Sequence, residues 1–137
     1  MTNKTKAPIH HVGLYIRTAL AEDTREGTSI RKQRDSLLRH ANERGYKVHD
    51  VYVDNGYSGL TLDRPALKRL LADCKAKRVK RIVVYGPDRL YRGPVEEMVS
   101  LLKDLLDSGI QIEVVTENVD FSFIARVIRE RRGESGV

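Results

Sequence analysis

Four short runs of β-branched and aromatic residues alternate with longer segments whose apolar residues recur at helical spacing. The runs lie at residues 11–16, 47–54, 81–85 and 110–115. Short strands joined by helical crossovers form a parallel sheet with right-handed connections. This alternation predicts an α/β fold with three layers: a mainly parallel central sheet of four or five strands, with helices on both faces.

Residues that start and stop helices flank the segments between these runs. Ser29 suits an N-cap, and Pro65 and Pro94 suit first helical positions. Gly45 and Gly109 stand where helices end. We therefore expect three crossover helices inside one folded domain at residues 11–120. Residues 1–10 are expected to form a flexible arm and residues 121–137 a short basic tail.

Composition restricts the class of protein and of partner. The 137 residues include 40% hydrophobic and 32% charged residues, a balance typical of a globular domain. The formal net charge of +6 favours polyanion partners, because lysine and arginine contacts to phosphates release counterions. A single cysteine, Cys74, fits a reducing cytoplasm, and no apolar run is long enough to span a membrane. We expect a cytoplasmic protein.

Four arginines follow the predicted strands at the edge where their carboxyl ends meet. Ligands bind at this edge of an open α/β sheet. The arginines are Arg17, Arg64, Arg89 and Arg92. Guanidinium groups donate paired hydrogen bonds to phosphate and stay charged, so a converging group of them calls for a bridging anion such as a phosphodiester.

Two simpler interpretations stay open for this edge. The arginines could instead pair with Asp54, Asp63 and Asp88 on a solvated rim. The chain could also be a response-regulator-like domain of the same architecture, but such domains need an acidic magnesium cluster and the first strand ends in Arg17. No metal or cofactor is expected, because the four histidines lack ligand spacing and no Walker, GxGxxG or HExxH motif is present.

The loops at this edge carry a set of motifs in a fixed order. They read Tyr15-Ile16-Arg17-Thr18-Ala19, then Gln33 with Leu37, then Asp54 to Gly59, then Asp63 to Leu67, and last Asp88 to Arg92. In these motifs the chain resembles the resolvase/invertase family of serine site-specific recombinases, and most closely the large integrase and transposase types. The resemblance covers about residues 12 to 118.

The resemblance implies a resolvase-like catalytic domain that cuts and rejoins double-stranded DNA through a 5′-phosphoserine link, without metal or cofactor. By motif position, Arg17, Arg64, Arg89 and Arg92 would hold the phosphate. Asp88 would orient arginines and assist the leaving oxygen, and Gln33 would support the pocket by hydrogen bonding. Supporting positions would be Tyr15, Asp54, Ser58, Gly59 and Asp63.

Ala19 stands at the position of the family's nucleophilic serine, so we expect a chain that does not cleave DNA. Neighbours are poor substitutes. Thr18 should face the opposite side of the strand, Ser29 serves as a cap, and Ser58 lies in a structural loop. The alanine is either an engineered substitution or a natural loss that leaves a non-catalytic interaction or regulatory module.

The end of the chain also bears on assembly. Family members continue into a long dimer-forming helix and DNA-binding domains, whereas residues 121–137 read as the truncated start of that linker. We therefore expect dimers or tetramers for a full-length protein and a monomer or weak dimer for this chain.

Overall fold

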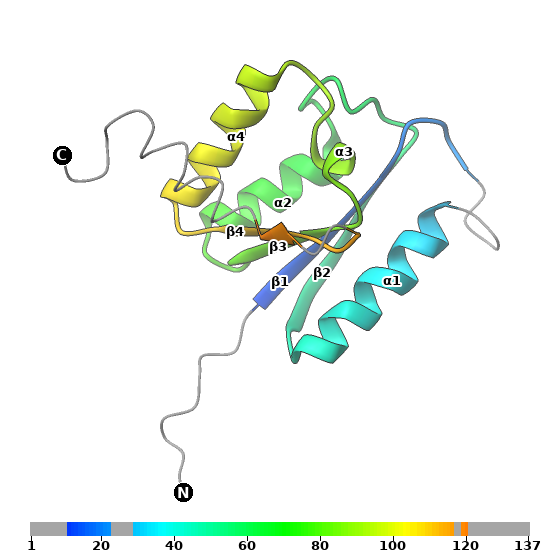
Figure 1. Cartoon of the computed structure of the whole chain (residues 1–137), viewed down its shortest axis with the longest axis vertical. Coiled ribbons are helices and arrows are strands. Elements are labelled where there is room, and N and C mark those ends of the chain that lie inside the picture. Colours follow the sequence, from blue (N-terminus) through cyan, green and yellow to red (C-terminus); the bar gives the residue numbers. More distant parts are fainter. Residues whose placement is uncertain (1–10, 23–28, 117–118, 121–137) are drawn as a thin grey trace, which may run out of the picture.

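The computed structural model describes residues 11–22, 29–116 and 119–120. They form one five-stranded sheet in the order β2-β1-β3-β4-β5 (Figure 1). The strands are β1 (His11–Thr18), β2 (Lys47–Asn55), β3 (Arg81–Val84), β4 (Gln111–Val114) and β5 (Val119–Asp120). β1 pairs in parallel with β2 and β3, β3 pairs in parallel with β4, and β5 is antiparallel to β4.

Helices cover both faces of this sheet. They are α1 (Ser29–Arg44), α2 (Pro65–Lys75), α3 (Pro87–Leu90) and α4 (Val95–Asp107). Side chains of β1 alternate between two apolar cores. Leu14 and Ile16 pack with α1 on one face, and Tyr15 packs with α2 and α4 on the other. Figure 1 shows α1 on one side of the strands and α2 and α4 on the opposite side.

The predicted parallel α/β architecture is confirmed. The four-residue helix α3 was not among the three predicted helices, because four residues are too few to show a helical repeat of apolar side chains. α2 ends at Lys75, because the chain turns at Lys77, whose φ of 65° leaves the helical region. The predicted arm at 1–10 and tail at 121–137 lie outside the described residues. Within the described residues, no helix is long and apolar enough to cross a membrane.

A buried carboxylate joins α1 to the sheet. Glu113 of β4 accepts hydrogen bonds from Arg81 and Tyr46 at 2.8 Å and contacts His40. Burial raises the pKa of Glu113, but the hydrogen bonds from His40 and Tyr46 and the charge of Arg81 outweigh burial and lower the pKa below its ordinary value. The cluster therefore holds an ionised carboxylate under α1.

Candidate functional site

Asp54, at the carboxyl end of β2, connects two strands and a helix. Its carboxylate accepts the Tyr15 hydroxyl at 2.7 Å and the backbone N–H groups of Ala66 and Leu67 at 2.8 and 3.0 Å. Those two amides belong to the first turn of α2, whose own N-cap, Arg64, makes no side-chain cap. Asp54 thus caps α2 from a neighbouring strand and holds the segment that carries Arg64 against β1.

Arg64 is completely buried and donates mainly to backbone carbonyls. Its Nε contacts the Thr61 carbonyl at 2.7 Å, and its Nη2 contacts the Leu90 carbonyl at 2.5 Å. Its Nη1 donates to the Tyr15 hydroxyl at 2.9 Å and to the Arg89 carbonyl at 3.2 Å. Arg64 therefore anchors α3 to the β2–α2 loop.

Arg17, near the end of β1, anchors the same short helix from the other side. The residue is 1% exposed, and its Nη2 and Nε donate to the carbonyls of Asp88 at 2.9 Å and Arg89 at 3.2 Å. Its Nη1 donates to the Tyr57 carbonyl at 2.9 Å. Burial lowers the pKa of Arg17, and the neighbouring charge of Arg64 lowers it further.

Gln33 supports this strand end from α1. Its side-chain Nε2 donates to the Arg17 carbonyl at 3.1 Å and to the Ser29 hydroxyl at 3.0 Å, and its Oε1 accepts the Arg17 backbone N–H at 3.4 Å. The Gln33 amide therefore forms hydrogen bonds with both the N–H and the carbonyl of the Arg17 backbone, in addition to the hydrogen bonds between the strands. Gln33 and Ser29 therefore fix the backbone from which the Arg17 side chain extends.

The other two arginines are more accessible. The Arg89 side chain is 26% exposed and lies 4.0 Å from the 51% exposed Asp88 carboxylate. Arg92 is exposed, and its backbone N–H donates to the Gly59 carbonyl at 2.8 Å. A Cβ on Gly59 would lie 2.9 Å from both the Arg17 guanidinium carbon and the Arg92 Cγ. Gly59 thus permits Arg17 and Arg92 to approach the same backbone.

Ala19 follows β1 at this edge and is exposed. The neighbouring hydroxyls are occupied. Thr18 is buried, and its Oγ1 donates to Asn55 Oδ1 at 3.2 Å, while Ser58 Oγ accepts the Leu60 N–H at 3.0 Å. These contacts support the expectation that neither hydroxyl acts as a nucleophile.

The structure brings the segments of all four predicted arginines together, but divides them into a buried pair and an accessible pair. Their assignment to phosphate binding stays a prediction. A solvated rim of Arg–Asp pairs describes the site poorly. Asp54 contacts Tyr15 and α2, Asp63 pairs with Lys68, and of these three aspartates only Asp88 forms an ion pair with one of the four arginines. Among the described residues, no group of three His, Cys, Asp or Glu side chains could hold a metal.

Sequence reasoning missed the main acceptors of the buried arginines. These are the backbone carbonyls of Tyr57, Thr61, Asp88, Arg89 and Leu90. Every residue has a carbonyl, so no residue type marks such a contact. The one local signal was Pro87 followed by three residues able to form a helical turn.

Known proteins share both the sequence pattern and the fold. Residues 12–128 match the family described as "Resolvase, N terminal domain". The N-terminal catalytic domain of TP901-1 integrase is 34% identical, with a TM-score of 0.75, over 90% of this chain and 97% of that one. The C-terminal catalytic domain of IS1535 TnpA, an IS607-like serine recombinase, is 35% identical with a TM-score of 0.60, over 75% of this chain and 69% of that one.

A curated relative agrees with these matches. A putative DNA recombinase of Bacillus subtilis (strain 168) is 33% identical over 88 residues, which is 64% of this chain but 17% of the relative. The chain therefore spans only a small part of that protein. With the family match over most of its length and the likeness to solved catalytic domains, the chain belongs to the resolvase family of serine recombinases.

Proposed function

We propose that the chain is the catalytic domain of a site-specific DNA recombinase in which the nucleophile is missing. The observation that carries this proposal is the convergence of Arg17, Arg64 and Arg89 around one short helix, beside a strand that ends at an alanine. Family membership supplies the reaction class, and double-stranded DNA is the proposed substrate.

In the proposed reaction a serine hydroxyl at position 19 attacks the phosphorus of a DNA phosphodiester. The Oγ–P bond forms and the P–O3′ bond breaks, leaving a 5′-phosphoserine and a free 3′ hydroxyl that receives the proton. The exposed guanidinium groups of Arg89 and Arg92 would contact the phosphoryl oxygens, and Asp88 would orient them or assist the 3′ oxygen. The methyl group of Ala19 cannot attack, so the chain as it stands should hold DNA without cutting it.

The buried arginines have a more specific part in this proposal. Arg17 and Arg64 would position α3, and hence Asp88 and Arg89, through their carbonyl contacts. Each guanidinium has at least one N–H group that these contacts do not use. Both side chains are buried, so in the proposed complex α3 would shift to let these groups donate to a phosphate that enters the site. Gln33, Tyr15, Asp54, Ser58, Gly59 and Asp63 would support the loops.

The test is Ala19→Ser in a protein that also carries DNA-binding regions, with a cognate duplex. The expected product is a covalent protein–DNA adduct that survives denaturing electrophoresis and releases a free 3′ hydroxyl strand. Ala19→Ser combined with Arg89→Ala is the matched control and should give at least about a hundredfold less adduct. Absence of adduct from Ala19→Ser on a cognate site would reject the enzyme interpretation.

A second candidate follows from the same alanine. A chain that carries alanine at position 19 by nature would be a non-catalytic partner of an active recombinase. In that case the native gene encodes alanine, and Ala19→Ser binds DNA or its partner unchanged but forms no adduct. A serine codon in the native gene rejects this second function.

A further inference from the structure

A basic hollow lies at the opposite edge of the sheet from the proposed catalytic site. It has a volume of about 560 Å³ and is formed by the end of α2, the start of β3 and the turn between α4 and β4. The buried side chains of Cys74 and Ile110 contribute its apolar lining. Since the parallel strands begin here, the eight-residue β1 separates this edge from the catalytic edge by about 26 Å.

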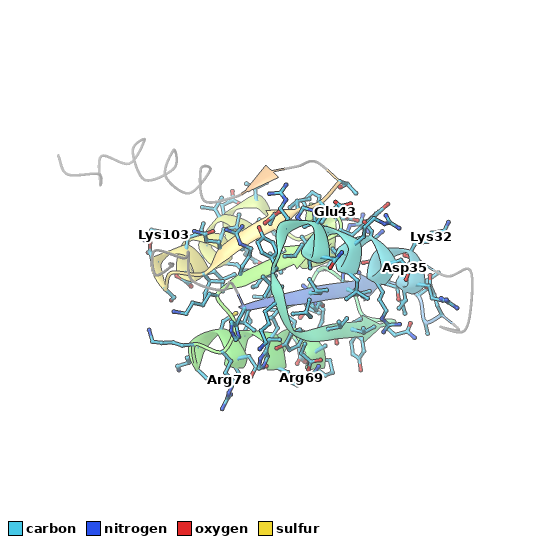
Figure 2. All side chains as sticks on the ribbon, turned by 90° about the horizontal axis from the view of Figure 1, so that it is seen from below. Lys32, Asp35, Glu43, Arg69, Arg78 and Lys103 are labelled. Atoms are coloured by element: carbon cyan, nitrogen blue, oxygen red, sulfur yellow. The ribbon has the colours of Figure 1, made fainter. Side chains whose placement is uncertain are left out.

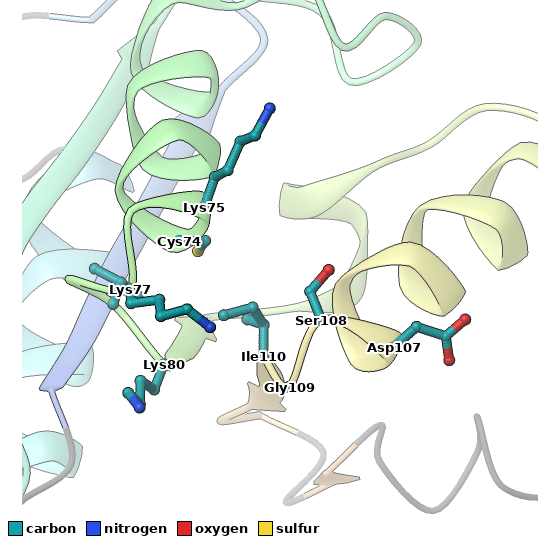
Figure 3. Close-up of a pocket in the computed structure, with 9 residues that line it drawn as sticks. Cys74, Lys75, Lys77, Lys80, Asp107, Ser108, Gly109 and Ile110 are labelled. Carbon is teal, nitrogen blue, oxygen red and sulfur yellow. The ribbon is translucent and has the colours of Figure 1, made fainter.

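Three lysines of this hollow have no carboxylate partner in the part of the chain that the structure describes. Lys75, Lys77 and Lys80 are exposed, and none of them takes part in an ion pair between described residues. Figure 3 shows Lys77 extending toward the α4–β4 turn, with Lys75 and Lys80 on either side of it. The carboxylate of Asp107, which pairs with Lys103 at 3.1 Å, points away from the hollow in the same view. The charge of the three lysines is therefore uncompensated.

The basic surface continues beyond this hollow. A second hollow of about 450 Å³ shares Lys77 and Lys80 and adds His11, His49 and Arg78. We call the two together the amino-edge surface: residues His11, His49, Lys75, Lys77, Arg78 and Lys80. It reaches from β2, which carries His49, to the segment before β3, and so crosses two strand spacings or about 10 Å.

The length of the amino-edge surface selects the class of ligand. One phosphate group contacts one or two lysines, whereas about 10 Å of duplex presents about three phosphates on each strand. Lysine ammonium groups on flexible stems suit contacts to a backbone without base recognition. Two described acidic side chains lie near this surface. Asp73 is paired with Arg78 at 3.3 Å, and Asp107, which lines the first hollow, is paired with Lys103 at 3.1 Å.

Lys77 provides an independent observation. Among the described residues other than glycine, only Lys77 has a positive φ, which is 65°. It lies just after the end of α2, a position at which glycine is usually favoured. Lys77 lines both hollows. Strained backbone of this kind concentrates at binding sites.

We propose that the amino-edge surface binds the phosphodiester backbone of a DNA segment separate from the one at the catalytic edge. The choice of DNA among polyanions rests on the proposed function, but the binding needs neither a nucleophile nor the arginines of the catalytic edge. One domain would then contact two stretches of DNA at opposite edges of its sheet.

The test measures binding of a fluorescent 20-base-pair duplex to the 137-residue chain by anisotropy, from 50 to 200 mM salt. Lys77→Gln with Lys80→Gln removes the two lysines that both hollows share. This pair should weaken binding at least about tenfold and lower the slope of log affinity against log salt by about 2. The matched control, Lys32→Gln with Arg39→Gln on α1, loses the same charge, and Figure 2 shows Lys32 far from Arg78.

Lys77→Gly separates a binding role from a structural one. It removes one charge but relieves the positive φ, so affinity should fall by about threefold while the melting temperature does not fall. A control pair that weakens binding as much as the Lys77 and Lys80 pair would overturn the proposal, since net charge alone would explain binding.

Competitors identify the anion. A duplex should displace the labelled DNA at much lower phosphate concentration than ATP or a polyglutamate peptide of equal charge. Equal competition by ATP would make this a site for a small phosphorylated compound, and equal competition by polyglutamate a site for an acidic protein; either overturns the DNA assignment. Failure of the proposed recombinase activity would appear separately, as no adduct from Ala19→Ser with these affinities unchanged.

Discussion

Arg17 and Arg64 donate to the same acceptor, the backbone carbonyl of Arg89, each at 3.2 Å. Two like charges are held together by a helix of four residues whose carbonyls point at them from one side. The negative ends of the backbone dipoles of α3 offset their repulsion. Any movement of α3 would therefore move both arginines, the exposed Asp88 and the half-buried Arg89.

Arg64→Ala should destabilise the fold strongly. It leaves the Thr61 and Leu90 carbonyls without their buried donor, and we expect a loss of about 3 kcal/mol in the free energy of unfolding. Urea denaturation followed by circular dichroism measures it. Arg92→Ala is the matched control and should change stability by under about 0.5 kcal/mol, since Arg92 is exposed. Similar losses in both variants would contradict the anchoring role of Arg64.

Gly59→Ala should displace the arginines that approach it. The new Cβ would lie 2.9 Å from the Arg17 Cζ and from the Arg92 Cγ, so one side chain must move. We expect a loss of about 1–3 kcal/mol on urea denaturation, and a loss of adduct when the change is combined with Ala19→Ser. Ser58→Ala, one residue earlier and exposed, should leave stability within about 0.5 kcal/mol. If Gly59→Ala changed neither stability nor adduct formation, the side chains of Arg17 and Arg92 would not be held close to Gly59.

Asp54→Asn should lower the free energy of unfolding more than Tyr15→Phe does. The asparagine loses one of the two oxygens that accept the α2 amides, and the charge that favours a helix N-terminus, so we expect a loss of about 2 kcal/mol. The phenylalanine removes one hydroxyl but leaves Asp54 on α2 and Arg64 on the Arg89 carbonyl, so about 1 kcal/mol is expected. Thermal unfolding ranks the two variants, and the reverse order would exclude helix capping as the main role of Asp54.

Stability should fall on acidification partly through Glu113. Its pKa in the folded state lies below its ordinary value, so its contribution is complete above the unfolded pKa of about 4.3 and is lost as pH falls through the folded pKa. Glu113→Gln should lose about 3 kcal/mol at pH 7, because the buried Arg81 loses its carboxylate. The difference between wild type and variant should shrink from pH 5 to pH 3 in denaturant titrations. A difference independent of pH would show that the lost contribution is not electrostatic.

Lys77→Gly should stabilise the chain, whereas Ala76→Gly should destabilise it. Lys77 has a φ of 65°, so glycine removes a steric conflict that outweighs its greater freedom in the unfolded state, for a net gain of about 0.5 kcal/mol. Ala76 has a φ of −80°, where glycine adds only unfolded-state entropy and lowers stability by about 0.5–1 kcal/mol. Calorimetric melting of the two variants gives the opposite signs, and equal signs would contradict the conformation at Lys77.

Much of this molecule could be predicted from local pattern. The β-branched runs marked the four parallel strands, and Gly45 follows the end of α1 as expected. Ser29, expected as the N-cap of this helix, is instead its first residue. Gln33 was expected to support the pocket and does contact the backbone of Arg17. These features depend on residue type and spacing, which a sequence displays directly.

Residue pattern was enough to predict the α/β class, the family, and the position of four arginines and an alanine at one edge of the sheet. The burial of Arg17 and Arg64 under α3, the partial burial of Arg89 and the exposure of Arg92 emerge from the folded chain alone. It alone also gathered Lys75, Lys77 and Lys80 around one hollow. These features depend on contacts between segments that are distant in sequence: hydrogen bonds to backbone carbonyls, close approaches of side chains, and the presence or absence of an opposite charge nearby. Residue type does not show which distant segment a side chain will contact, so the sequence does not reveal them.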